Sequence, residues 1–153
     1  RFSRSVHFVL QAAPTTEQDR AEVEALVAHY RAHATITVLT DKRIGAAWYE
    51  MIAGVDALFL PYTAERYRYN WSALYFTAIG FHKPVITTAV LNPEILVEFD
   101  VGRIVSMDSY EEFCMGMENF VNTFSQRQEN YARNLTAASK KYSRTNFIRN
   151  LLN

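Results

Sequence analysis

The segment Ala57–Thr88, ALFLPYTAERYRYNWSALYFTAIGFHKPVITT, decides the fold of this 153-residue chain. It begins with an apolar run, 57–61, that has the length and flanking residues of a buried strand, and a second such run follows at 85–88. Between the two runs, apolar residues recur at helical spacing. They are Trp71, Leu74, Tyr75, Ala78 and Ile79. A strand, a helix and a second strand in this order predict parallel strands joined by a helical crossover.

The connection from the first strand into this helix carries the candidate binding residues. Asn70 stands where an N-cap belongs, so the free N–H groups from Trp71 to Ala73 are expected to point out of the first turn. The preceding loop contains Arg66 and Arg68. A helix that starts at the carboxyl end of a parallel strand, beside arginines, is a typical phosphate site of α/β folds.

The same alternation of strands and helices continues on both sides of this segment. Strands are expected at 6–10, 36–39 and 103–106. Helices are expected from a capping box of Thr15 and Gln18 to about His33, around Trp48–Ile52, from Asn92, from Asp108 or Ser109 to Phe124, and at the carboxyl end with a break near Ser143. The predicted fold class is therefore α/β, with a parallel sheet covered by helices on both faces.

Composition narrows the functional classes. Hydrophobic residues make up 49% of the chain and aromatic residues 14%, which indicates a globular protein. The 16 basic and 16 acidic residues cancel, so the chain has no overall field that would recruit nucleic acid or a membrane surface. Without a signal peptide or an apolar run of membrane-spanning length, a cytoplasmic protein is expected.

Several kinds of catalytic or redox site are not indicated. Cys114 is the single cysteine, so an internal disulfide is excluded, and its place in an apolar stripe predicts a buried thiol. The four histidines show no metal-ligand spacing, so no metal site is predicted. No Gly-x-Gly-x-x-Gly or Walker loop follows a strand, which argues against dinucleotide or P-loop ATP chemistry.

Four stretches of this sequence together resemble the C-terminal, nucleotide-sugar-binding domain of a retaining GT-B glycosyltransferase of the group 1 type. They are Val55–Tyr62 (VDALFLPY), Ser72-Ala73, Ala78–Ile86 (AIGFHKPVI) and Val101–Val105 (VGRIV). The resemblance implies a Rossmann-like three-layer αβα fold, one half of a GT-B protein. Residues 1–153 would then form a single donor-binding domain, with a helical region at 126–152 that returns toward the missing N-terminal half.

The sequence also departs from that family. Its members usually carry two glutamates eight positions apart, and the matching positions here are Tyr69 and Thr77. The family's Gly-Arg and Lys-Gly elements, which hold the diphosphate, would lie upstream of Arg1. The chain is therefore expected to be a piece of a longer protein that begins one βα unit into its domain.

The resemblance assigns binding roles to particular residues. The diphosphate of a nucleotide sugar would lie at the helix start, the base would contact the loop after the second strand, and Thr77 would reach a ribose hydroxyl. The nucleotide-sugar residues are thus Ser72, Ala73, Arg66, Arg68, Tyr69, Asn70, Thr77, Thr40, Asp41 and Lys42. The alternatives are a capped helix with surface arginines, a turn-forming Asp41, and a Thr77 bonded to its own helix backbone. The loop aromatics Tyr62, Tyr67, Tyr69 and Trp71 either stack on the ligand or pack the loop.

Two functions follow from the resemblance. The first is the donor-binding domain of a hexosyltransferase that moves a sugar to a polysaccharide, lipid or protein acceptor, inactive without its missing half and using no metal or cofactor. Peripheral membrane association would involve that missing half. The alternative is a non-catalytic binding or scaffold module, favoured by the loss of both glutamates. A flavodoxin-like signalling or metabolic domain is a third class, for which no acidic phosphoacceptor cluster is present.

Overall fold

The computed structural model describes residues 2–151 of the chain. Their contacts divide them into two units, which we call the amino-terminal unit (Phe2–Tyr49) and the carboxy-terminal unit (residues 50–151). Helix α2 (Ala46–Ala53) contains the boundary between them. Each unit contains a parallel sheet, so the predicted α/β class with parallel strands is confirmed. The strands lie in two hydrogen-bonded sheets, not in one.

The amino-terminal unit is a single βαβ element. Strand β1 (Phe8–Gln11) pairs in parallel with β2 (Ile36–Leu39), and α1 (Glu17–Tyr30) connects them. None of the described residues up to Tyr49 is buried. A two-stranded sheet with one helix therefore encloses no core of its own.

The cap of α1 differs from the predicted one by one residue. Thr16, not Thr15, is the N-cap, and its hydroxyl accepts the N–H of Asp19 at 3.1 Å. The Asp19 carboxylate in turn accepts the N–H of Thr16 at 2.9 Å, which completes a capping box with Asp19 in place of Gln18. The same carboxylate accepts the Thr15 hydroxyl at 2.6 Å. A carboxylate accepts such bonds more strongly than an amide oxygen does, which explains the shift.

The sheet of the carboxy-terminal unit has three parallel strands in the order β3-β4-β5. They are β3 (Leu58–Leu60), β4 (Val85–Thr87) and β5 (Gly102–Ile104), with Phe59 opposite Ile86 and Ile86 opposite Arg103. All three residues of β4 are buried, as expected for a central strand with both faces covered.

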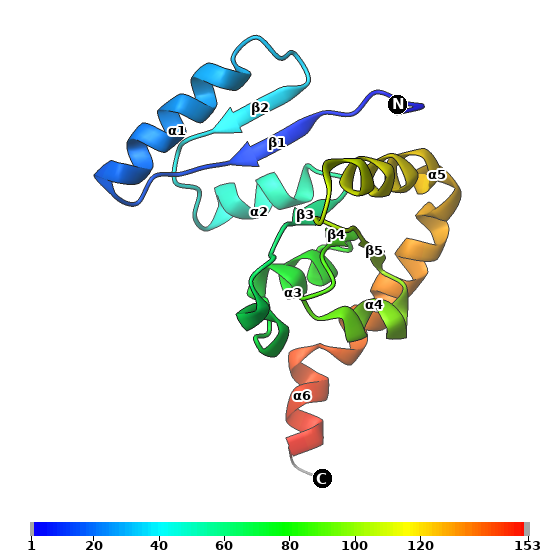
Figure 1. The fold of residues 1–153 in the computed structure, drawn as a ribbon. Coiled ribbons are helices and arrows are strands. Elements are labelled where there is room, and N and C mark those ends of the chain that lie inside the picture. Colours follow the sequence, from blue (N-terminus) through cyan, green and yellow to red (C-terminus); the bar gives the residue numbers. More distant parts are fainter. Residues whose placement is uncertain (1, 152–153) are drawn as a thin grey trace. The chain divides into compact units, whose positions relative to one another are not determined.

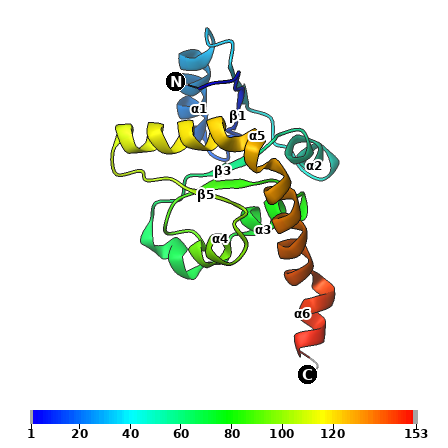
Figure 2. The same ribbon diagram turned by 90° about the vertical axis from the view of Figure 1, so that its right-hand side faces the viewer.

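Helices cover both faces of this sheet (Figures 1 and 2). Helices α3 (Ala73–Gly80) and α4 (Pro93–Phe99) lie on one face, and the first half of α5 (Tyr110–Lys141) lies on the other. Phe59 of β3 contacts Phe113 of α5, with 5.7 Å between the ring centroids. Helix α5 then bends, and its second half runs alongside α3 and α4 (Figure 2). Helix α6 (Arg144–Leu151) follows.

The helical end of the chain is more continuous than the sequence suggested. Ser109 is the N-cap of α5, as predicted. The single 32-residue helix α5 replaces the separate helices expected before and after Phe124. It ends at the predicted break, with Tyr142 as C-cap. Leu152, within the predicted region 126–152, lies outside the described residues. Cys114 is half-buried, so the prediction of a buried thiol is wrong.

The core of the carboxy-terminal unit lies on both sides of β4. Its largest fully enclosed side chains include Tyr75, Tyr131, Ile52, Leu60, Ile79, Leu91, Ile95 and Leu135. Two glycines allow close approach between backbones or elements. A Cβ on Gly102 would lie 1.9 Å from the carbonyl oxygen of Val85, and one on Gly116 would lie 2.8 Å from Cγ1 of Val105.

Candidate functional site

The β3–α3 loop (residues 61–72) contains a short 3₁₀ helix, η1 (Glu65–Tyr69). Helix α3 therefore begins at Ala73, two residues later than the sequence predicted. Asn70 is the C-cap of η1 and not the N-cap of α3, because its N–H is bonded to the Tyr67 carbonyl at 3.3 Å and its Nδ2 donates to the Arg66 carbonyl at 2.9 Å. Trp71 precedes α3 and is 63% exposed, so it does not belong to the buried stripe of that helix.

Ser72 is the residue that caps α3. Its hydroxyl accepts the N–H of Tyr75 at 3.2 Å, and its own N–H donates to Oδ1 of Asn92 at 3.2 Å. Among the described residues, no acceptor is bonded to the N–H groups of Ala73 and Leu74. The first turn of α3 therefore has two amides without an acceptor among the described residues, at the positive end of the helix dipole.

The β4–α4 turn (residues 88–92) holds the β3–α3 loop at both ends. The Thr88 hydroxyl donates to the carbonyl of Tyr62 at the start of the loop. Asn92 accepts the Ser72 N–H at its end. Both Thr88 and Asn92 are buried, at 5% and 3% exposure, whereas their partners Tyr62 and Ser72 are half-buried. The loop consequently lies at the carboxyl edge of β3 and β4, where ligands of parallel sheets bind.

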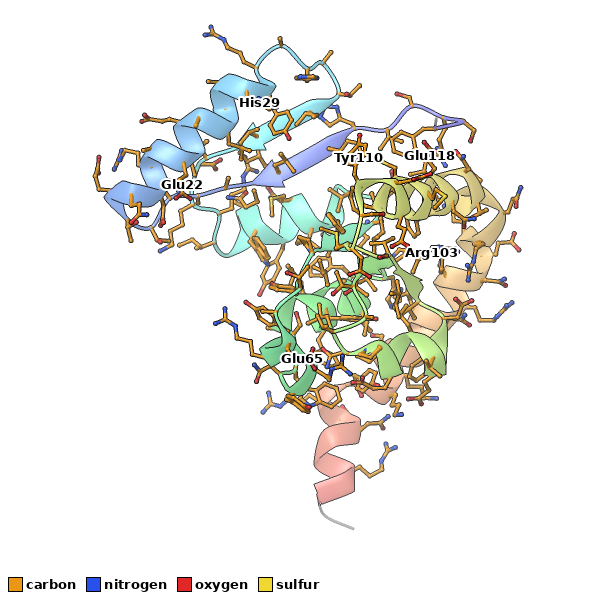
Figure 3. All side chains as sticks on the ribbon, viewed as in Figure 1. Glu22, His29, Glu65, Arg103, Tyr110 and Glu118 are labelled. Atoms are coloured by element: carbon orange, nitrogen blue, oxygen red, sulfur yellow. The ribbon has the colours of Figure 1, made fainter. Side chains whose placement is uncertain are left out.

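The two arginines of η1 differ in their partners. Arg68 forms an ion pair with Glu65 at 2.6 Å (Figure 3, where Glu65 marks the start of η1). Arg66 has no acidic partner among the described residues; its guanidinium lies 5.1 Å from the ring centroid of Tyr67, and Nη2 is 3.3 Å from the Tyr67 hydroxyl. Arg66 is thus the cation of this loop that a ligand could engage.

Three aromatic side chains of the loop pack on other rings, and a fourth, Tyr69, is largely exposed. Tyr62 and Tyr67 pack on each other, with 4.5 Å between ring centroids. Tyr69 is 80% exposed. Trp71 stacks on Phe76 at 5.2 Å and also meets Tyr142 near the end of α5. Tyr69 is therefore the loop aromatic with the most surface open to a ligand.

Thr77 lies in the interior of α3 and does not extend toward the loop. Its hydroxyl donates to the carbonyl of Ala73 at 2.9 Å, one turn earlier in the same helix. This is the backbone-bonded alternative considered for a threonine within a helix. A ribose contact would require Thr77 to exchange that bond.

The predicted base-binding residues belong to the amino-terminal unit. The Asp41 carboxylate pairs with Arg43 at 3.2 Å, and the Asp41 carbonyl accepts Nε2 of Gln11 at 2.9 Å. Lys42 is exposed. Thr40 contributes to a groove of about 620 Å³ beside α1, which Val23, Val27 and Val38 also line.

Two buried hydroxyls near the carboxyl edge of β4 were missed by sequence reasoning. Among the described residues, the hydroxyls of Tyr75 and Thr87 have no hydrogen-bond partner, and both residues have 0% exposure. Burial, followed by the charge of Glu94 and then by Tyr142, raises the pKa of Tyr75 well above its usual value. The clearest signal in the sequence was the polar pair Thr87-Thr88 at the end of an apolar strand.

Outside the β3–α3 loop, the described residues show the following features. A hollow of about 170 Å³ lies at the opposite, amino-terminal edge of the sheet, lined by Asp56, His82, Lys83 and Tyr131 among others. In residues 2–151, the histidine, cysteine and acidic side chains form no group of three that could hold a metal ion. No helix in this part of the chain combines the length and apolarity needed to cross a bilayer.

The fold is that of a Rossmann-like half of a GT-B protein. Among solved structures, the chain is similar to WaaG, described as a glycosyltransferase involved in lipopolysaccharide biosynthesis, with a TM-score of 0.60 over 93% of this chain. The chain spans 45% of the WaaG chain, and 17% of the aligned residues are identical. At this identity the likeness shows the fold alone. No protein-family profile matches the sequence, and no curated protein matches it.

Proposed function

We propose that this chain is the donor-binding domain of a glycosyltransferase and that the start of α3 binds the diphosphate of a nucleotide sugar. The observation that carries the proposal is the pair of unbonded amides, Ala73 and Leu74, at the carboxyl edge of β3 and β4. Arg66, without an acidic partner among the described residues, adds a positive charge in the same loop. The GT-B-like fold supports the same function, because WaaG is a glycosyltransferase.

The chemistry of such a site is electrostatic. When a sugar leaves its nucleotide diphosphate, negative charge grows on the departing phosphate oxygen. The N–H groups of Ala73 and Leu74 and the guanidinium of Arg66 would stabilise that charge without a metal or another cofactor. The acceptor, a polysaccharide, lipid or protein, would be held by the other half of a GT-B protein in the cytoplasm. Arg68, Tyr69 and Asn70 lie in the same loop as Arg66 and would complete the diphosphate site.

A thermal-shift series with UDP, GDP, ADP, CDP and TDP tests the proposal, because a ligand that binds only the folded state raises its melting temperature. We expect one diphosphate to stabilise the protein, by about 2.7 kcal/mol at a hundredfold excess over its Kd. Ser72→Asp should abolish the shift, since aspartate still caps the helix but places a negative charge beside the phosphates. Arg66→Ala should weaken the shift.

Arg133→Ala is the matched control for Arg66→Ala. Arg133 lies on the exposed surface of α5, where it donates to Asn130, so its removal changes the net charge equally without touching the loop. A diphosphate shift that survives Ser72→Asp would contradict the assignment to α3. Absence of any shift in the wild-type protein would remove the donor-binding proposal.

The second candidate function is a non-catalytic binding or scaffold module. Neither Tyr69 nor Thr77 supplies the carboxylate that the resemblance leads one to expect at these positions. In addition, the Thr77 hydroxyl is bonded to its own helix backbone. Both observations favour this module. Such a module would give no shift with any nucleoside diphosphate. A shift together with the Ser72→Asp loss would therefore exclude it.

A further inference from the structure

Asn92 makes the hydrogen bond that joins the starts of α3 and α4. It is the N-cap residue of α4, it is only 3% exposed, and its backbone is left-handed, with φ of 43°. Its Oδ1 accepts the Ser72 N–H at 3.2 Å, and its Nδ2 lies 3.3 Å from Oε1 of Glu94. The amide side chain thus acts on α3 and does not cap its own helix.

The bond from Ser72 to Asn92 engages the first N–H group at the start of α3. Of the first four N–H groups, that of Ser72 is held by Asn92 and that of Tyr75 by the Ser72 hydroxyl. Among the described residues, the N–H groups of Ala73 and Leu74 have no acceptor. The bond to Asn92 fixes the Ser72 peptide group. The two peptide groups that follow are therefore oriented before any ligand arrives, which lowers the ordering cost of binding.

A second observation at this edge concerns Thr87, the last residue of β4. Its hydroxyl is enclosed and has no partner among the described residues, although buried hydroxyls ordinarily have one. Thr88, the next residue, is bonded to the Tyr62 carbonyl. The end of β4 and the turn after it therefore hold two buried hydroxyls in succession, and that of Thr88 contacts the β3–α3 loop.

We propose that Asn92 is a positioning residue for the diphosphate: by holding the Ser72 N–H, it directs the N–H groups of Ala73 and Leu74 toward the phosphate oxygens. This inference rests on the proposed function and deepens it. If Asn92 has this role, the contribution of the phosphates to affinity depends on Asn92, and the contribution of the nucleoside does not.

The experiment measures the Kd of the nucleoside diphosphate and of its nucleoside by calorimetry, for the wild-type protein and Asn92→Gly. Glycine adopts the left-handed conformation readily, so this variant removes the side chain without straining the turn. We expect the diphosphate Kd to rise about tenfold, the effect of losing roughly one well-placed hydrogen bond to an anion, and the nucleoside Kd to stay within about twofold. His82→Gly is the control, because His82 has a φ of 54° on the opposite edge of the sheet.

Hydrogen exchange of the Ser72 amide tests the contact itself. We expect faster exchange in Asn92→Gly and retained protection in Asn92→Asp, which keeps an acceptor oxygen. The inference is overturned if Asn92→Gly binds the diphosphate as tightly as the wild-type protein, or if diphosphate and nucleoside affinities fall equally. In both cases the proposed function stands. If the wild-type protein binds no nucleoside diphosphate, the proposed function itself fails, and this inference falls with it.

Discussion

Replacing Gly102 with alanine is expected to be among the most damaging single-methyl changes in this chain. The added Cβ would lie 1.9 Å from the Val85 carbonyl oxygen and 2.8 Å from the Val85 carbonyl carbon and nitrogen. All three are backbone atoms of the central strand, so no side-chain rotation relieves the clash. Ordinary contact begins near 3.4 Å, so β5 would have to move by about 1.5 Å relative to β4.

Such a displacement affects the pairing of the two strands. The bonds from Val85 N to Val101 O, at 3.1 Å, and from Val105 N to Thr87 O, at 2.8 Å, flank the clash. Overpacking alone costs about 1–3 kcal/mol, and two weakened hydrogen bonds cost about 0.5–1.5 kcal/mol each. Gly102→Ala should therefore lower the free energy of unfolding by about 2–6 kcal/mol, a large part of the stability of a typical domain.

Urea denaturation followed by circular dichroism measures this loss, and two other glycines calibrate it. Gly116→Ala meets a movable side-chain methyl of Val105 and should cost less than Gly102→Ala. Gly80→Ala meets no atom within 4 Å and should stabilise α3 by up to about 1 kcal/mol. The reasoning is refuted if Gly102→Ala unfolds within about 1 kcal/mol of the wild-type protein, or if Gly116→Ala is the more destabilising change.

Two further predictions concern pH. Burial raises the pKa of Tyr75, with Glu94 as the second cause, so the folded state retains that proton above the ordinary tyrosine pKa of 10.0, and stability should fall as the pH rises beyond that value. Tyr75→Phe should remove this part of the decrease of the urea midpoint with pH, and an unchanged dependence on pH would contradict the prediction. Hydrogen bonds, first from the Thr15 side chain, lower the pKa of Asp19 below 3.8. Their contribution to the stability of the folded state is therefore present above that pH and is lost as the pH falls through the pKa of Asp19 in the folded protein. An NMR titration should show the Asp19 carboxyl protonating below pH 3.8, and an Asp19 that titrates at or above 3.8 would refute this.

The order of strands and helices could be predicted because each element has its own local pattern. The run at 57–61 and the run at 85–88 are apolar and short, and they became β3 and β4. Helix α3 follows its predicted stripe from Leu74 onward. These signals depend on neighbours along the chain, which a sequence displays directly.

The start of α3 could not be predicted, because two good capping residues compete there. Asn70 and Ser72 are both favoured N-caps, and local preference does not separate them. The structure gives Asn70 to η1 and Ser72 to α3, and the Ser72 N–H is fixed by Asn92, 20 residues away. A contact of that range leaves no trace in the local sequence.

The same reason explains why Thr88 and Asn92 were not among the predicted site residues. Both are residue types common in exposed turns, and the sequence places them in one. Their burial and their bonds to the β3–α3 loop arise only when β3 and β4 pair. Arg66 and Arg68, in contrast, could be named as the cations of this loop from the sequence alone, but their different partners could not.

The uneven distribution of burial affects how this chain would denature. The enclosed side chains all lie at or beyond Ile52, whereas residues 2–49 contain none. Ordering the backbone costs about 1–2 kcal/mol per residue wherever it occurs, so the amino-terminal βαβ element offsets that cost with little apolar burial. Its strands are therefore expected to open at lower free energy than β3, β4 and β5. We therefore expect two unfolding events in a thermal scan, which a single melting temperature would not describe.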